Sequence, residues 1–74
     1  MKKNRYKLIR TWVKTDETEG WSYGIQINDR RFEDLHANKE RVYKLMTLFK
    51  RYNVSEEEFA ADLKDYVDSL YDPQ

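Results

Sequence analysis

The chain has 74 residues, no cysteine, and equal numbers of basic and acidic residues, 14 of each. This length predicts one domain, residues 1–74, and the lack of cysteine excludes disulfides and zinc sites built on thiolates. No apolar run approaches the roughly 20 residues of a membrane span, and no apolar segment follows Met1 as in a signal peptide, so we expect a cytoplasmic protein without a membrane partner.

Charge is distributed unevenly along the chain although the total is zero. Residues 1–15 contain no acidic residue and six basic ones, which are Lys2, Lys3, Arg5, Lys7, Arg10 and Lys14. Residues 55–74 contain seven acidic residues and a single basic one, Lys64. A basic arm of this kind suits an anionic partner. Alternatively, the two ends lie together and neutralise each other, which requires no partner.

The first part of the chain predicts a β-hairpin. Residues 5–15 are rich in β-branched and aromatic side chains, and residues 21–28 alternate strictly, with apolar residues at every second position from Trp21 to Ile27. The polar segment 16–20 suits the connection. Pairing Thr15 with Gly20 places Leu8 and Trp12 on the same face as Trp21. A slip of one residue would exchange the two faces, because side chains alternate with a period of two.

A third strand is predicted over residues 30–35. Asn28 and Asp29 both tolerate positive φ and suit a two-residue turn, which brings Phe32 opposite Ile25. This strand is the weakest element of the pattern, since Glu33 and Asp34 favour neither a strand nor a core.

Two helices are predicted over about residues 39–52 and 56–71. Asn38 is expected to cap the first helix, whose apolar residues recur at spacings of three and four. Ser55 and Glu58 form a capping box for the second helix, and Val54 with Phe59 forms a hydrophobic staple. This helix is expected to end near Asp72–Pro73.

These elements predict an α+β fold, in which a two- or three-stranded antiparallel sheet is followed by an antiparallel pair of helices packed on one face. Residues on the opposite face of the first strand and tyrosines on the helix flanks are then candidates for a protein-binding surface, because tyrosine contributes contact area with little entropy loss. The candidate residues are Ile9, Thr11, Val13, Tyr43, Tyr52 and Tyr71.

Nucleic-acid binding has two conceivable routes in this sequence. Two helices joined by a short turn resemble a helix-turn-helix, but the acidic second helix would be repelled by phosphates. The basic hairpin is the remaining route, because basic side chains interleaved with aromatic rings are typical of single-strand platforms. The candidate anion-binding residues are Lys7, Arg10, Lys14, Arg30 and Arg31.

No residue pattern predicts catalysis. His36 is the single histidine and stands near Glu33 and Asp34, but no second histidine completes a metal site, and no cysteine or evident nucleophile stands with it. Ser55 is explained by capping. We therefore expect a non-enzymatic protein without metal or cofactor.

Several segments carry a resemblance to a known family. They are Tyr23-Gly24-Ile25, Phe32 to Leu35, Val42, Leu45 to Phe49, and Val54-Ser55 before an acidic helix. Over about residues 5–70 the chain is similar to a family of small proteins of unknown function from Gram-positive, spore-forming bacteria, and it departs from that family at His36 and at Glu56 to Glu58. The resemblance implies strands followed by two helices and a bacterial or phage origin, and no activity.

Three functional hypotheses remain from the sequence. The first is a protein-binding module or accessory factor, whose partner is another protein or a second copy of this chain in a homodimer. The second is a nucleic-acid binder that uses the basic hairpin. The third is an inhibitor from a phage or mobile element that binds a host protein.

Overall fold

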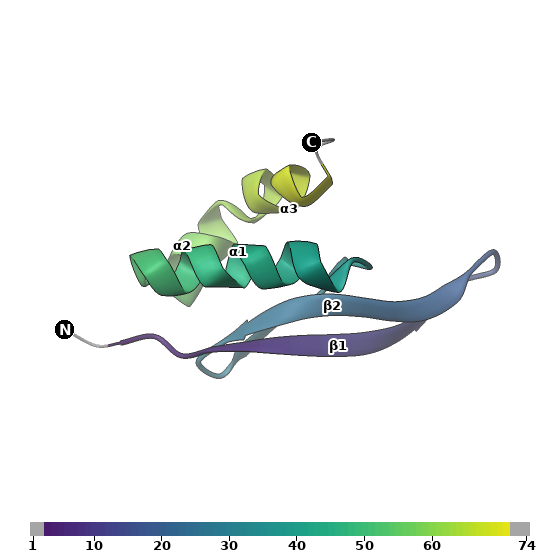
Figure 1. The fold of residues 1–74 in the computed structure, drawn as a ribbon, viewed down its shortest axis with the longest axis horizontal. Helices are drawn as coiled ribbons and strands as arrows, with labels where there is room; N and C mark the ends of the chain where they lie inside the picture. Colours follow the sequence, from purple (N-terminus) through teal and green to yellow (C-terminus); the bar gives the residue numbers. More distant parts are fainter. Residues whose placement is uncertain (1–2, 72–74) are drawn as a thin grey trace.

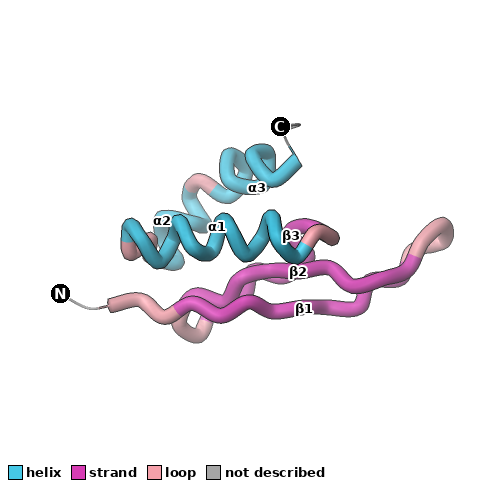
Figure 2. The backbone as a smooth tube through the Cα atoms, viewed as in Figure 1, coloured by secondary structure: helices cyan, strands magenta, loops and turns pink. Residues whose placement is uncertain are grey.

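The computed structural model describes residues 3–71 and shows an α+β fold, with a three-stranded antiparallel sheet followed by three helices. The strands are β1 (Tyr6–Lys14), β2 (Glu19–Ile27) and β3 (Arg30–His36), and the helices are α1 (Lys39–Tyr52), α2 (Glu56–Ala61) and α3 (Leu63–Tyr71). The helices lie over one face of the sheet, as Figures 1 and 2 show. The predicted helix end at Asp72–Pro73 lies outside the described residues.

The sheet has the order β1-β2-β3, and its register differs from the prediction. Gly20 pairs with Val13 instead of Thr15, and Trp12 pairs with Trp21. The register is therefore displaced by two residues, which preserves the assignment of side chains to faces because that assignment has a period of two. A short turn fixes the displacement, since the Thr15 N–H donates to the Thr18 carbonyl at 2.7 Å.

The third strand is present, with an irregularity that the sequence did not predict. Phe32 lies opposite Ile25 as expected, but the next pair is Tyr23 with His36, so β3 has two more residues than β2 between these pairs. Asp34 has a φ of 57° within this bulge. The bulge lies against Gly24, where an added Cβ would stand 2.1 Å from the Phe32 carbonyl oxygen. A glycine at this position is what allows the two backbones to approach so closely.

The caps of α1 and α2 agree with the sequence. The Asn38 side chain accepts from the Arg41 N–H, and the Ser55 hydroxyl accepts from the Glu58 N–H. Val54 and Phe59, the two residues of the predicted staple, are both buried. Asn53 caps the C-terminus of α1 with a left-handed backbone, at a φ of 49°. Asparagine tolerates this conformation better than most residues.

The predicted second helix is interrupted, which corrects the expectation of one helix over 56–71. Asp62 lies between α2 and α3 with a φ of −109° and a ψ of 22°. Its N–H donates to the Glu58 carbonyl, and its own carbonyl accepts from the Tyr66 N–H, so a single residue ends one helix and starts the next. Aspartate has low propensity for helix interiors and is favoured at helix starts. Figure 1 shows the chain changing direction here. The antiparallel pairing of two helices stays a prediction.

The core lies between the helices and the helix-facing side of the sheet. Its buried members come from β2, β3, all three helices and the α1–α2 connection: Ile25, Ile27, Phe32, Leu35, Val42, Leu45, Met46, Phe49, Val54, Phe59 and Leu70. Aromatic rings form its centre, where the Phe59 ring is 4.5 Å from that of Phe32 and 4.8 Å from that of Phe49. From β1, Tyr6 and Leu8 pack against this cluster at its edge.

A cluster of asparagines joins the start of the chain to the helices. The Asn4 side chain donates to the Asn53 carbonyl at 3.1 Å, and Asn28 donates to Asn4 at 3.0 Å and to Glu56 at 3.3 Å. The Tyr6 hydroxyl donates to the Val54 carbonyl at 2.5 Å. These contacts hold the first strand, the β2–β3 turn and the start of α2 together through hydrogen bonds rather than ion pairs.

Candidate binding surface

The most distinctive surface is the end of the β1–β2 hairpin, residues 12–21, which we call the hairpin arm. Figure 1 shows that the hairpin extends beyond the first turn of α1, so that no helix covers its end. None of these residues is among the buried residues of the core or the partly buried apolar residues packed against it. The arm is nevertheless ordered by its own turn, where the Thr15 hydroxyl accepts from the Thr18 N–H at 3.0 Å.

Two tryptophans form a pair on the helix-facing side of the arm. The rings of Trp12 and Trp21 are 5.2 Å apart at an interplanar angle of 82°, the edge-to-face arrangement that aromatic quadrupoles favour. The two residues remain 51% and 42% exposed. A pair of this kind stabilises a hairpin through cross-strand contact, and it also leaves a large apolar surface in solvent.

Arg10 extends this aromatic surface toward the body of the protein. Its guanidinium lies 4.2 Å from the centre of the Trp21 ring, a cation–π contact. Beside it, Leu8, Ile9, Tyr23 and Lys39 line an open hollow between the sheet and the start of α1. One face of Trp21 is thereby occupied by Arg10, so that face is not available for stacking on a nucleobase.

The outer edge of β1 is the second feature of this surface. The Asn28 N–H donates to the Arg5 carbonyl, and the Thr15 N–H donates to the Thr18 carbonyl. In an antiparallel ladder these bonds assign the odd-numbered residues of β1 to hydrogen-bonded pairs with β2. The N–H and C=O groups of the even-numbered residues, among them Leu8, Arg10 and Trp12, therefore point away from β2. Within residues 3–71 these backbone groups of β1 have no backbone partner.

The five candidate anion-binding residues do not form one surface. By register, Arg10 and Lys14 lie on the helix-facing side, and so does Arg30, which pairs with Ile27 and lies 5.0 Å from the Phe32 ring. Lys7 and Arg31 lie on the opposite side, both beside Gln26. Arg31 is in addition paired with Glu33 at 2.9 Å. The structure thus divides these charges between the two faces of the sheet.

The candidate residues of the protein-binding surface are also dispersed. Ile9 lies on the predicted face but is only 7% exposed. Ile9 stands opposite Gly24, and the β3 bulge lies against Gly24 on the same face of the sheet. We attribute the burial of Ile9 to this bulge. Thr11, next to the hairpin arm, and Val13, within it, are half-buried.

The three tyrosines of that set are exposed but lie apart. Tyr43 and Tyr52 lie on α1, while Tyr71 ends α3. The Tyr71 hydroxyl donates to the Leu35 carbonyl at 3.1 Å and its ring lies 4.3 Å from that of His36, which indicates a structural role. The sequence interpretation did not select Trp12 and Trp21 as binding residues, because strand alternation places them on the face of the sheet on which the helices are expected to pack. That alternation identifies the face of the sheet but not how far the helices extend over it.

His36 has a structural environment. Its Nδ1 accepts from the Asn38 N–H at 2.8 Å, so the neutral ring carries its proton on Nε2. Burial lowers the pKa of His36, and the positive charge of Arg41 lowers it further. Among the described residues, no three histidine or acidic side chains come together as a metal ligand set.

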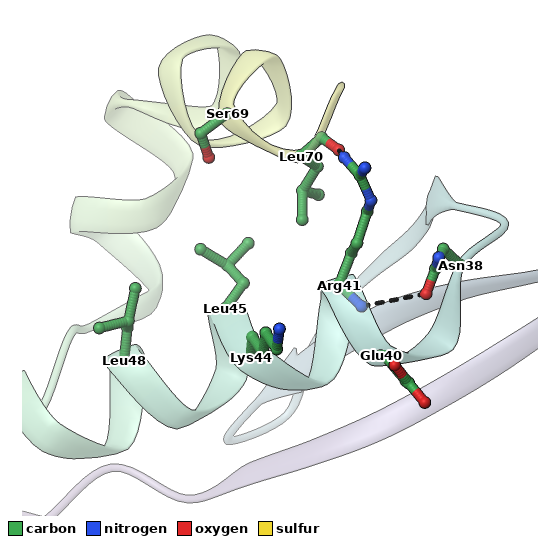
Figure 3. Close-up of a pocket in the computed structure, with 8 residues that line it drawn as sticks. All are labelled: Asn38, Glu40, Arg41, Lys44, Leu45, Leu48, Ser69 and Leu70. Carbon is green, nitrogen blue, oxygen red and sulfur yellow. Dashed lines mark hydrogen bonds between the residues drawn. The ribbon is translucent and has the colours of Figure 1, made fainter. Parts of the chain in front are cut away.

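A second hollow lies between α1 and α3 and is drawn in Figure 3. Leu45, Leu48 and Leu70 form its apolar part, and Lys44, Glu40 and Ser69 stand at its polar rim. Arg41 closes one end by donating to the Leu70 carbonyl at 2.6 Å. The Arg41 guanidinium is thus held by the end of α3, and the polar groups do not converge on a common point in the hollow.

Comparison with models of known protein families, with curated proteins and with solved structures gave no match. The resemblance to the family from spore-forming bacteria therefore stays a prediction. Across residues 3–71, no helix combines the length and the apolar character required to cross a membrane.

Proposed function

We propose that this chain is a protein-binding module and that it binds its partner through the hairpin arm and the adjoining edge of β1. The exposed pair of Trp12 and Trp21 is the observation that supports this proposal most directly. Tryptophan is strongly enriched among the residues that dominate protein-binding energies. In a chain this small, large apolar side chains are needed for the core, yet these two lie outside it.

The distribution of charge favours a protein partner over a nucleic acid. A single-strand platform needs basic side chains along one groove and open aromatic faces. Here the basic residues lie on both faces of the sheet, and Arg10 covers one face of Trp21. An inhibitor that binds a host protein would use the same arm, so this hypothesis specifies the partner's origin rather than a different surface.

The test is capture and affinity measurement with the arm altered. Trp12 and Trp21 are both replaced by threonine, which keeps strand propensity, and Tyr52→Ser serves as the control because Tyr52 is 69% exposed on α1 and lies outside the arm. Each form is immobilised and offered lysate from cells that encode the protein, once without and once with nuclease treatment. The captured partner is then purified and titrated against each form.

We expect the tryptophan variant to bind the partner at least about tenfold more weakly than wild type, as the loss of a binding hot spot predicts, and the Tyr52→Ser variant to bind normally. Equal affinity of all three forms would refute the arm as the binding surface. Binding that disappears on nuclease treatment would instead support the nucleic-acid hypothesis.

A further inference from the structure

We infer that the partner contributes an extended acidic segment, which adds to the free edge of β1 as a fourth strand. This inference rests on the proposed function and specifies the chemistry of the partner. Strand addition uses main-chain hydrogen bonds for affinity and alternate side chains for specificity. The geometry and the charge of β1 both point to this mode.

The edge is long enough and sufficiently open to pair with a strand. Strand β1 has nine residues, or about 30 Å at the usual rise per residue. Its even-numbered residues direct their N–H and C=O groups away from β2, as the hydrogen bonds at Asn28 and Thr15 require. Figure 2 shows β1 at the border of the sheet, without a further strand on its outer side.

The charge of β1 selects an acidic segment. Its three charged residues, Lys7, Arg10 and Lys14, are all basic. None of them forms an ion pair with another residue in the described range. The ion pair on the sheet in that range joins Arg31 and Glu33. In particular, none of them is ion-paired with the acidic helices α2 and α3. Lys14 stands across from Glu19 of β2, whereas Lys7 and Arg10 stand across from uncharged residues. Acidic side chains on an added strand would lie directly across from these bases, where opposite charges stabilise pairing.

The same charges disfavour a second copy of this chain as the fourth strand. Pairing β1 with β1 would bring three basic residues from each copy into one ladder that contains no acidic residue. Like charges across strands are destabilising, and lysines on edge strands are a known means of preventing self-pairing. An acidic strand from another protein is the occupant that this edge accepts.

The spacing of the bases specifies a probe peptide. In an antiparallel fourth strand, the residues across from Lys14, Arg10 and Lys7 stand at positions one, five and eight. The capped peptide Glu-Thr-Val-Thr-Glu-Thr-Val-Glu-Thr places acids there and valines across from Leu8 and Trp12. One control peptide has lysine in place of the three glutamates. A second control keeps the acids but carries N-methyl groups on the backbone amides that face β1.

Binding is measured by calorimetric titration, and strand addition by amide hydrogen exchange followed by NMR. We expect the acidic peptide to bind at least about tenfold more tightly than either control, and more weakly as salt is raised, since exposed charges are screened. The amides of Leu8, Arg10 and Trp12 should exchange at least about tenfold more slowly in the complex. Those of Ile9 and Thr11, which already bond to β2, should change little and provide an internal reference.

A charge-reversed variant completes the test. Lys7→Glu with Lys14→Glu leaves Arg10 and both tryptophans in place and should transfer the preference from the acidic to the lysine peptide. The inference is overturned if the acidic peptide binds no better than the controls or binds without protecting the three amides. It is also overturned if oligo-dT binds in its place, or if light scattering gives the mass of two chains. Such failures would leave the tryptophan test of the proposed function unaffected, since that test does not depend on the partner's charge.

Discussion

Replacing Gly24 with alanine should be among the most destabilising single-methyl additions in this protein. The new Cβ would stand 2.1 Å from the Phe32 carbonyl oxygen, 3.0 Å from the Glu33 Cα and 3.1 Å from the Phe32 carbonyl carbon. All three are backbone atoms, so no side chain can rotate away, and the bulge of β3 must move by about 1 Å or more. Overpacking of this kind usually costs 1–3 kcal/mol, and we expect about 3 kcal/mol here.

The measurement is urea unfolding followed by circular dichroism. A chain of 74 residues has a folding free energy of roughly 4–11 kcal/mol and a urea dependence of about 1 kcal/mol per M. The midpoint of Gly24→Ala should therefore fall by about 3 M, or the variant should fail to fold. Gly20→Ala is the matched control, because nothing lies within 4 Å of its added Cβ. It should be neutral or stabilising by up to about 1 kcal/mol.

The result that refutes this reasoning is a Gly24→Ala midpoint within about 0.5 M of wild type while Gly20→Ala is also neutral. In that case β3 would not lie against Gly24, and both the bulge and the explanation for the buried Ile9 would be incorrect. A loss in both variants would indicate that glycine is required along β2 for a reason other than the β3 contact.

Three further predictions concern the caps and the titrating groups. Ser55→Ala removes the acceptor for the Glu58 N–H and should lower the unfolding free energy by about 1 kcal/mol, whereas Ser55→Asp should not; equal urea midpoints for wild type and Ser55→Ala would contradict this. Tyr6→Phe removes the hydrogen bond to the Val54 carbonyl and should cost about 1 kcal/mol, measured in the same way, and no change would mean that water replaces the hydroxyl. For His36, burial disfavours the charged ring and holds the folded pKa below the ordinary 6.5. The unfolded chain therefore takes up the proton first, and stability is lost as pH falls from 6.5 through the folded pKa. The urea midpoint of wild type should be lower at pH 5.5 than at pH 7.5, and this difference should shrink in His36→Asn; an unchanged difference would contradict the assignment.

Strand pairing shows which features of the sheet the sequence alone predicts. The alternation from Trp21 to Ile27 predicted correctly which side chains face the helices, because this property depends only on parity. It could not decide between the register that pairs Gly20 with Thr15 and the one that pairs it with Val13, since both place the same residues on each face. The hydrogen bonds of the Thr15–Thr18 turn made that choice, and the sequence interpretation had assigned a longer loop.

The helices likewise have features that the sequence predicts and one that it does not. Asn38 and Ser55 cap their helices as predicted, since a cap is a local interaction between a side chain and a backbone amide three residues later. The interruption at Asp62 was not predicted. The apolar spacing from Phe59 to Leu70 fits one continuous helix equally well, so periodicity carries no information about a single-residue break.

The sequence by itself determined the capped helices, the two faces of the hairpin and the basic character of the first strand, because these depend on residue type and on contacts a few positions apart. Only the tertiary structure decided what those features leave open to a partner. Helix α1 leaves the end of the hairpin uncovered, as Figure 1 shows, and Trp12 and Trp21 remain exposed. Among residues 3–71, hydrogen bonds of Asn4 and Tyr6, rather than ion pairs, join the start of the chain to the α1–α2 connection. Both outcomes depend on where long-range packing places one element against another, and no local pattern specifies that position.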